Sequence, residues 1–161
     1  MRAWCWPLLA CMFVASAACG PPVDLSKALQ VSDVSTGWFD AGIVAGQNKL
    51  VPAITFRVKN VSDRTLNVLQ VNAIFRRVSE TTEWGSAFLP VTGSEGLAPG
   101  ATTSVLTARS QLGYTGSDQS RDDMLRNSHF IDAKVELLAK YSSTQWTRVY
   151  EAPIARQLVT K

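Results

Sequence analysis

Apolar and polar residues alternate over most of the chain after residue 25. Such a period of two places successive side chains on opposite faces of a β-strand, one facing a core and one facing water. The longest run is FIDAKVELLAKY (130–141), which predicts a half-buried strand with Val135 and Leu137 on its buried face. Ile131 and Tyr141, near the ends of the run, are expected on the same face. Shorter runs predict further strands at residues 28–39, 53–60, 66–77, 83–91, 101–110 and 146–154.

Short segments rich in turn-forming residues separate these runs. NVSDRT (60–65), GLAPG (96–100) and YSSTQW (141–146) carry Asn, Asp, Ser, Gly or Pro. These residues favour turns through local side-chain hydrogen bonds or permissive backbone angles. Pro153 indicates that the last predicted strand ends there or lies at a sheet edge, because proline donates no ladder hydrogen bond.

Only the segment SRDDMLRN (120–127) has a helical signature. Ser120 is a suitable N-cap, and Asp123 lies three residues later, as in a capping box. Asp122 and Asp123 also favour the positive end of the helix dipole. Asn127 is expected to end the helix after about two turns.

About seven short strands and one short helix near 120–127 predict an all-β fold, an immunoglobulin-like antiparallel β-sandwich. The stretch FRVKNVSDRTLNVLQVNAIFRR, followed by LAPG and a Thr-rich strand, resembles the FxLYD and late-embryogenesis-type sandwiches of exported bacterial proteins. The resemblance covers roughly residues 50–108 and rests on turn motifs. It implies a sandwich fold and a non-enzymatic accessory role, and it carries over no functional residues.

The N-terminal residues 1–18 have the layout of a secretory signal peptide. Arg2 precedes the apolar run Trp4–Ala15, which is followed by small residues. A membrane-spanning helix needs about 20 apolar residues, and this run of twelve is shorter. The sequence therefore predicts export.

Cys19 is the candidate lipid-attachment residue. The other two cysteines, Cys5 and Cys11, lie within the leader, so cleavage before Cys19 leaves one cysteine and no internal disulfide. Residues 16–19, Ser-Ala-Ala-Cys, resemble a bacterial lipobox, in which the cysteine carries lipid. The lipobox usually has Leu where this chain has Ser16, which leaves an ordinary signal-peptidase cut as an alternative.

The sequence after Cys19 predicts a tether and then a single domain. The resemblance to a lipobox implies that Gly20 directs the protein to an outer membrane, facing the periplasm, where one exists. Pro21 and Pro22 favour an extended chain. We expect a lipid-anchored tether over residues 19–25 and the sandwich domain over residues 26–161.

The composition indicates a folded domain and argues against nucleic-acid binding. Apolar residues make up 46% of the chain and charged residues 18%, unlike the composition of disordered chains. The formal net charge is +3, and the basic residues are scattered between acidic ones. Nucleic-acid binding would favour a basic stripe or a recognised motif.

The candidate catalytic and metal-binding residues form no recognised constellation. His129 is the single histidine, so a transition-metal site lacks ligands. The chain contains no G-x-S-x-G motif that would support a Ser-His-Asp triad. Glu136 and Glu151 approach one another if their strands pair, but a solvated surface explains them as well. The aspartates Asp118, Asp122 and Asp123 lack calcium-loop spacing. We therefore expect no enzyme activity, no metal and no cofactor.

Aromatic residues near strand ends remain candidates for binding. They are Trp38, Phe39, Trp84, Tyr114, Trp146 and Tyr150. One interpretation is that they close the two ends of the sandwich core. The other is that Trp38, Trp84, Tyr114 and Trp146 form an exposed platform for a protein or a sugar.

The polar stretch Thr107–Met124 is long for a strand connection, and long loops on a rigid sandwich often bind partners. Within it, Arg109–Arg121 is the candidate partner-binding segment, with Tyr114 as its aromatic residue. Gly113 and Gly116 are expected to supply unusual backbone angles. A solvated connection between strands is the alternative.

These patterns together predict a lipid-anchored cell-envelope protein that acts as a non-enzymatic binding or assembly module. Its expected partners are a membrane, through lipid on Cys19, and an envelope protein. The alternative is a carbohydrate-binding module or a weak hydrolase that uses the aromatic loop ends.

Overall fold

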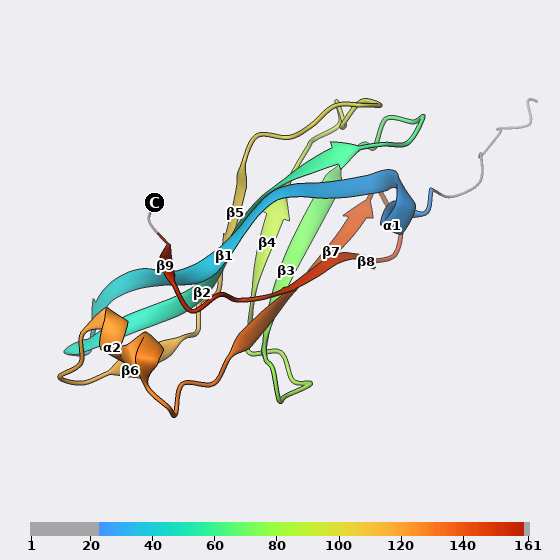
Figure 1. Cartoon of the computed structure of the whole chain (residues 1–161). Coiled ribbons are helices and arrows are strands. Elements are labelled where there is room, and N and C mark those ends of the chain that lie inside the picture. Colours follow the sequence, from blue (N-terminus) through green and yellow to red (C-terminus); the bar gives the residue numbers. More distant parts are fainter. Residues whose placement is uncertain (1–22, 160–161) are drawn as a thin grey trace, which may run out of the picture.

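The computed structural model describes residues 23–159 as two β-sheets packed face to face (Figure 1). The elements in this part of the chain are α1 (Leu25–Ala28), β1 (Leu29–Val44), β2 (Gln47–Asn60), β3 (Leu69–Arg77), β4 (Gly85–Pro90), β5 (Leu106–Arg109), β6 (Tyr114–Gly116), α2 (Arg121–Arg126), β7 (Ala133–Tyr141), β8 (Thr147–Pro153) and β9 (Leu158–Val159). Helix α1 lies at one end of the sandwich, and α2 and β6 lie beside the β1–β2 hairpin at the other.

The strand order is that of an immunoglobulin-like sandwich, as the sequence predicts. One sheet has the order β5-β2-β1-β9, with β6 paired to a further stretch of β2, and the other has the order β4-β3-β7-β8. Neighbouring strands are antiparallel except for β1 and the two-residue β9, which are parallel. The chain passes between the sheets after β2, after β4, before β7 and after β8, so strands distant in sequence become neighbours. The second sheet matches the C′-C-F-G order of immunoglobulin domains.

The core lies between the two sheets and contains the predicted inward faces. Val135 and Leu137 are fully buried, which confirms the face assigned to the longest alternating run. The other large side chains with almost no exposed surface are Trp38, Phe56, Phe75, Leu25, Leu50, Ile54, Leu66, Leu69, Val58 and Val71. These residues come from both sheets and from α1, so a single core holds the described part of the chain together.

The turn after β2 depends on the side chain of Asn60, which is fully buried. Its Oδ1 accepts hydrogen bonds from the backbone N–H and the hydroxyl of Ser62, at 3.0 and 2.7 Å. Its Nδ2 donates to the carbonyls of Arg64 and Leu97, both at 2.7 Å. The asparagine therefore joins two loops at the α1 end of the sandwich, and a buried polar group is satisfied in the process.

Helix α2 forms as predicted. The hydroxyl of Ser120 accepts a hydrogen bond from the backbone N–H of Asp123 at 3.2 Å and donates one to its carboxylate at 2.6 Å. Asp122 and Asp123 lie in the first turn, and Asn127 is the C-cap. Similarly, β8 ends at Pro153 and forms an edge of its sheet, as the proline indicates.

The predicted strand at 130–141 is too long at its start. Strand β7 begins at Ala133, and the side chain of Ile131 is 41% exposed rather than buried. Before β7 the backbone carbonyls bind side chains instead of a neighbouring strand: Phe130 O accepts from Arg156 at 2.7 Å, and Ile131 O accepts from Tyr114 at 3.2 Å. The alternating sequence pattern therefore begins at Phe130, three residues before the strand itself begins.

The domain also begins earlier than residue 26. Leu25 is 2% exposed within the core, and Val23 donates its backbone N–H to the hydroxyl of Tyr141 at 3.1 Å. Asp24 caps α1, a helix that the sequence analysis misses. Residues 23–25 thus belong to the folded domain rather than to a tether. Cys19 and the leader lie outside the described residues.

The stretch between β5 and α2 is not one continuous loop. Strand β5 is shorter than the predicted 101–110, because Thr103 pairs irregularly with Val58, both donating to and accepting from its backbone. Farther along, Tyr114–Gly116 form β6 and pair with Asn48–Leu50 of β2. The predicted binding loop therefore contains a strand of the first sheet.

Candidate functional site

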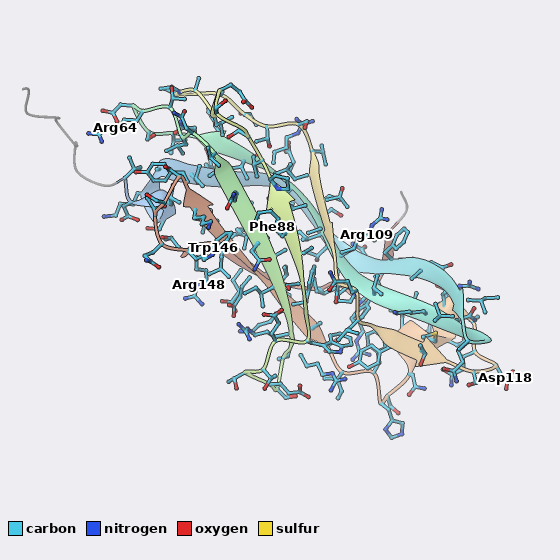
Figure 2. The ribbon with its side chains drawn as sticks, turned by 180° about the vertical axis from the view of Figure 1, so that it is seen from behind. Arg64, Phe88, Arg109, Asp118, Trp146 and Arg148 are labelled. Carbon is cyan, nitrogen blue, oxygen red and sulfur yellow. The ribbon has the colours of Figure 1, made fainter. Side chains whose placement is uncertain are left out.

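The outer face of the β4-β3-β7-β8 sheet is the candidate functional site. Its central row runs from Phe88 on β4 through Asn72 and Leu138 to Arg148 on β8, as the strand registers place these residues opposite one another. The inward neighbours on the two central strands, Val71, Ala73, Leu137 and Ala139, are fully buried, so the sheet is a rigid support for the outward side chains. Figure 2 is viewed toward this face, with Phe88, Trp146 and Arg148 labelled.

Two aromatic side chains are exposed on this sheet face. Phe88 is 55% exposed and Trp146, just before β8, is 39% exposed. Their ring centroids lie 6.5 Å apart with an angle of 84° between the ring planes, an edge-to-face pair. The Nζ of Lys140 lies 5.0 Å from the centroid of the Trp146 ring, within cation–π range. An exposed aromatic pair with an adjacent cation is typical of protein-binding surfaces.

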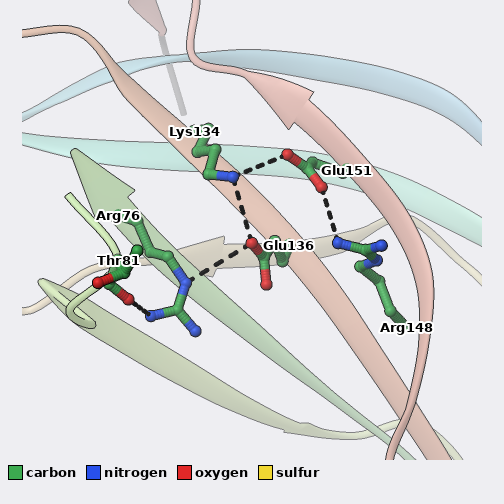
Figure 3. Close-up of polar contacts among 6 residues, drawn as sticks. All are labelled: Arg76, Thr81, Lys134, Glu136, Arg148 and Glu151. Atoms are coloured by element: carbon green, nitrogen blue, oxygen red, sulfur yellow. Dashed lines mark hydrogen bonds and ion pairs between the residues drawn. The ribbon is translucent and has the colours of Figure 1, made fainter. Parts of the chain in front are cut away.

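A row of ion pairs borders the aromatic pair on the same face (Figure 3). Glu136 lies 3.6 Å from Arg76 Nε and 3.4 Å from Lys134 Nζ. Lys134 also lies 2.9 Å from Glu151, which pairs with Arg148 at 3.1 Å. The hydrogen bond and charge of Lys134 hold the pKa of Glu151 below its ordinary value, and Glu151 in turn raises the pKa of Lys134.

With Lys140, the face carries four basic and two acidic side chains, a net charge of +2. The two carboxylates neutralise only two of the four cations, and the side chain of Arg148 is 60% exposed. The face therefore combines apolar rings with a moderate excess of positive charge.

Glu136 and Glu151 lie opposite one another on the paired strands β7 and β8, as expected if these strands pair. Lys134 bridges them, however, and the lowered pKa of Glu151 keeps it ionised. A glycosidase needs one carboxylic acid whose pKa is raised so that it can donate a proton. The environment of Glu151 has the opposite effect on its pKa.

Three of the four aromatic residues of the predicted platform, Trp38, Trp84 and Tyr114, form a cluster in which Trp38 is buried and the other two are half-buried. Trp38 is fully buried, and its ring contacts Tyr114 at 5.7 Å and Trp84 at 6.2 Å between centroids. Phe130 completes the cluster at 4.5 Å from Trp38. Trp38 Nε1 has no hydrogen-bond partner among residues 23–159, so packing alone holds the ring. The platform interpretation is therefore wrong for Trp38, which closes the core.

Tyr114 and Trp84 are half-buried around this cluster. The Arg77 guanidinium covers them, 4.9 Å from the Trp84 ring and 5.8 Å from the Tyr114 ring. Burial raises the pKa of the Tyr114 phenol, whose hydroxyl donates to the carbonyl of Ile131. These contacts give both rings a structural role at the end of the sandwich opposite α1.

Gly113 and Gly116 allow close packing rather than unusual backbone angles. Neither has a positive φ, contrary to the expectation from sequence. A Cβ on Gly113 would collide with the carbonyl oxygen of Leu50, and one on Gly116 would lie 2.9 Å from the Met124 side chain. The two glycines thus let β6 approach β2 and α2.

A small hollow of about 160 Å³ lies beside Tyr114, between Met124 and Phe130. His129 lines its rim and is exposed. Within residues 23–159, His, Cys, Asp and Glu side chains do not gather in groups of three that would hold a metal ion. In the same part of the chain, no helix has the length and apolar character needed to cross a membrane.

Phe88 is the aromatic residue of the site that the sequence patterns do not single out, and the basic residues around it are not singled out either. It lies in the predicted strand 83–91, between Ala87 and Leu89. Leu89 and Ala87 turn toward the core, so the alternation leaves Phe88 on the outer face. An aromatic residue out of phase with its apolar neighbours is the signal that would have identified it.

No protein-family model matches the chain, and no curated protein matches its sequence. Among solved structures, the X-ray structure of the Northeast Structural Genomics Consortium target SoR45 is similar, with 12% sequence identity and a TM-score of 0.46. The similar region covers 82% of this chain and 89% of that one. No relative contributes to the assignment of the candidate site, which rests on the residues of this chain alone.

Proposed function

We propose that this protein is a lipid-anchored envelope protein that acts as a non-enzymatic binding or assembly module. Its partner is another envelope protein, which contacts the outer face of the β4-β3-β7-β8 sheet. The observation that carries this proposal is the exposed pair of Phe88 and Trp146 on a sheet whose opposite side is the core. A few residues, enriched in Trp, Tyr and Arg, supply most of the binding energy in protein interfaces.

The geometry favours a protein over a sugar as the partner. The apolar faces of neighbouring sugar rings stack on aromatic rings that lie in one plane, whereas Phe88 and Trp146 are nearly perpendicular. Lys140 also covers a face of the Trp146 ring. A protein surface with an apolar projection and acidic neighbours fits the edge-to-face pair and the net positive charge.

The anchor part of the proposal rests on the leader and on Cys19. Val23, four residues after Cys19, is held at the α1 end by its hydrogen bond to Tyr141. A lipid on Cys19 would thus keep this end of the domain near the membrane. Replacement of the cysteine, Cys19→Ser, should move the protein from the membrane fraction to the soluble fraction. An unmodified mature N-terminus, found by mass spectrometry in the native host, would reject the lipid anchor.

The binding part is tested with a benzophenone amino acid at Asn72, between Phe88 and Leu138. In cells that produce the full-length chain, irradiation should yield an adduct with one envelope protein. The double variant Phe88→Ser/Trp146→Ser should reduce this adduct at least about tenfold, as expected for loss of a binding hot spot. Val105→Ser, at a residue 52% exposed outside this sheet, is the matched control. An adduct that survives the double variant in a folded protein would reject the face as the binding site.

A further inference from the structure

The tip of the β1–β2 hairpin is an apolar projection that the proposed function does not use. Residues 41–46, Ala-Gly-Ile-Val-Ala-Gly, contain no polar side chain. Ile43 is 71% exposed and Val44 is 45% exposed. Single exposed apolar residues are common on protein surfaces, but a contiguous apolar segment at a loop tip indicates an interaction site. In Figure 1 this tip lies at the end of the molecule opposite α1.

The hairpin turn has a backbone conformation that polar residues and glycine usually adopt. Ala45 and Gly46 have φ angles of 51° and 79°, as a tight two-residue hairpin turn requires. Asn, Asp and Gly are the residues that adopt positive φ most readily. Ala45 takes a less favourable conformation than these residues and adds no hydrogen-bonding side chain. The turn is therefore apolar at a position where local backbone energetics favour a polar residue.

The tip is braced from one side, so it projects as a fixed shape. Arg121 of α2 forms an ion pair with Asp40 at 2.8 Å, close to the start of the tip. On β2, Gln47 donates to the hydroxyl of Ser117 and Asn48 donates to the carbonyl of Gln119, both at 2.6 Å. The segment between β6 and α2 thus holds the hairpin in place. A rigid apolar projection loses little conformational entropy when it binds.

Acidic side chains are in excess beside the tip. Residues 117–126 carry three aspartates against two arginines, and one of these, Arg121, pairs with Asp40. Asp118, Asp122 and Asp123 are exposed in the segment that braces the hairpin. Within the part of the chain that the structure describes, none of the three forms an ion pair with a basic side chain. Figure 2 shows Asp118 at this end of the molecule. These carboxylates oppose contact with an anionic lipid surface, and they complement basic groups on a protein.

We propose that the hairpin tip inserts into an apolar pocket of a partner protein whose rim carries basic side chains. Ile43 and Val44 fill the pocket, and the three aspartates pair with the rim. This contact is separate from the β4-β3-β7-β8 face, which carries positive charge and lies on the other sheet. The protein would then bind through two surfaces of opposite charge.

The test places a benzophenone amino acid at Ile43 of the full-length chain in producing cells. The control position is Val61, 48% exposed at the α1 end. After irradiation, a C-terminal tag isolates the adducts, and peptide mass spectrometry identifies the attached molecule. The expected result is one protein adduct at Ile43, at least about tenfold more abundant than at Val61. The attached peptide should combine apolar residues with Lys or Arg.

Two variants test the chemistry of the contact. Val44→Ser and the double charge reversal Asp118→Lys/Asp122→Lys should each reduce the adduct at least about tenfold. The matched charge reversal Asp63→Lys/Glu95→Lys, in the loops at the α1 end, should leave it unchanged. Because all of these side chains are exposed, unchanged melting temperatures will confirm that the variants fold.

Several results would overturn the inference. They are equal adducts at both positions, an adduct with lipid, an adduct of two copies of this chain, no adduct at all, or an adduct insensitive to the charge reversal. The crosslink at Asn72 reports on the sheet face independently. If Asn72 forms its adduct and Ile43 does not, the proposed function stands and this inference fails.

Discussion

Two neighbouring leucines on β7 provide a sharp test of the sandwich. Leu137 is fully buried and faces the core, whereas Leu138 is half-buried on the outer face, between Asn72 and Arg148. Both positions carry leucine, and they are adjacent on the same strand. Replacement of each by alanine therefore compares the two faces of one sheet directly.

The expected losses differ about threefold. Leu→Ala in a filled core costs about 2–5 kcal/mol, because it removes buried apolar surface and leaves a cavity. With no exposed surface at Leu137, we expect about 3 kcal/mol, which lowers the Tm of a domain of this size by about 10 °C. Leu138→Ala removes partly exposed surface and leaves no cavity, so about 1 kcal/mol is expected.

Urea unfolding followed by tryptophan fluorescence measures both losses, with thermal melts by circular dichroism as a second assay. The buried Trp38 should report loss of the core. Equal m-values for the two variants would show that only the stability has changed. Equal losses, or a larger loss at Leu138, would refute the assigned face, because a register slip by one residue exchanges the two sides of a strand.

Three further predictions concern local contacts. Ser120→Ala should cost about 1 kcal/mol in urea unfolding, since the α2 cap is lost; no loss would show that the cap adds nothing. Gly113→Ala should cost about 1–3 kcal/mol, because a Cβ meets the backbone of β2; a neutral result in the same assay would exclude the close packing. Glu151→Gln should lower the Tm at neutral pH, and the difference from the parent should shrink as the pH falls through the lowered pKa of Glu151. A difference that grows in acid would contradict the pairing with Lys134.

The sequence predicts the inward faces of the strands well, because a period of two is a local property of the chain. The buried positions on β3 and β7 alternate as the residues do. The cap of α2 and the contact of Asn60 with Ser62 are also local, since each joins residues within a few positions of one another. These features need no knowledge of which strands are neighbours.

The arrangement of the aromatic residues depends on long-range pairing and could not be predicted in the same way. Trp38, Tyr114 and Phe130 come from three distant segments and meet only because β6 pairs with β2. The role of Gly113 likewise depends on a carbonyl more than 60 residues earlier in the chain. Trp146 lies exposed beside Phe88 because the strands have the order β4-β3-β7-β8. Alternation of apolar and polar residues alone does not define that order.

Strand β1 has a mechanical consequence. It spans 16 residues, a length of about 50 Å, between α1 and the hairpin tip. A pull between Val23 and Ile43 acts along an extended backbone with two irregularities in its pairing to β2, between Ser32 and Ser35 and between Asp40 and Ile43. The single turn of α1 lengthens by only about 7 Å when it unwinds. The domain would therefore transmit tension between its ends along β1, and this load passes through a strand whose Leu29 and Trp38 are part of the core.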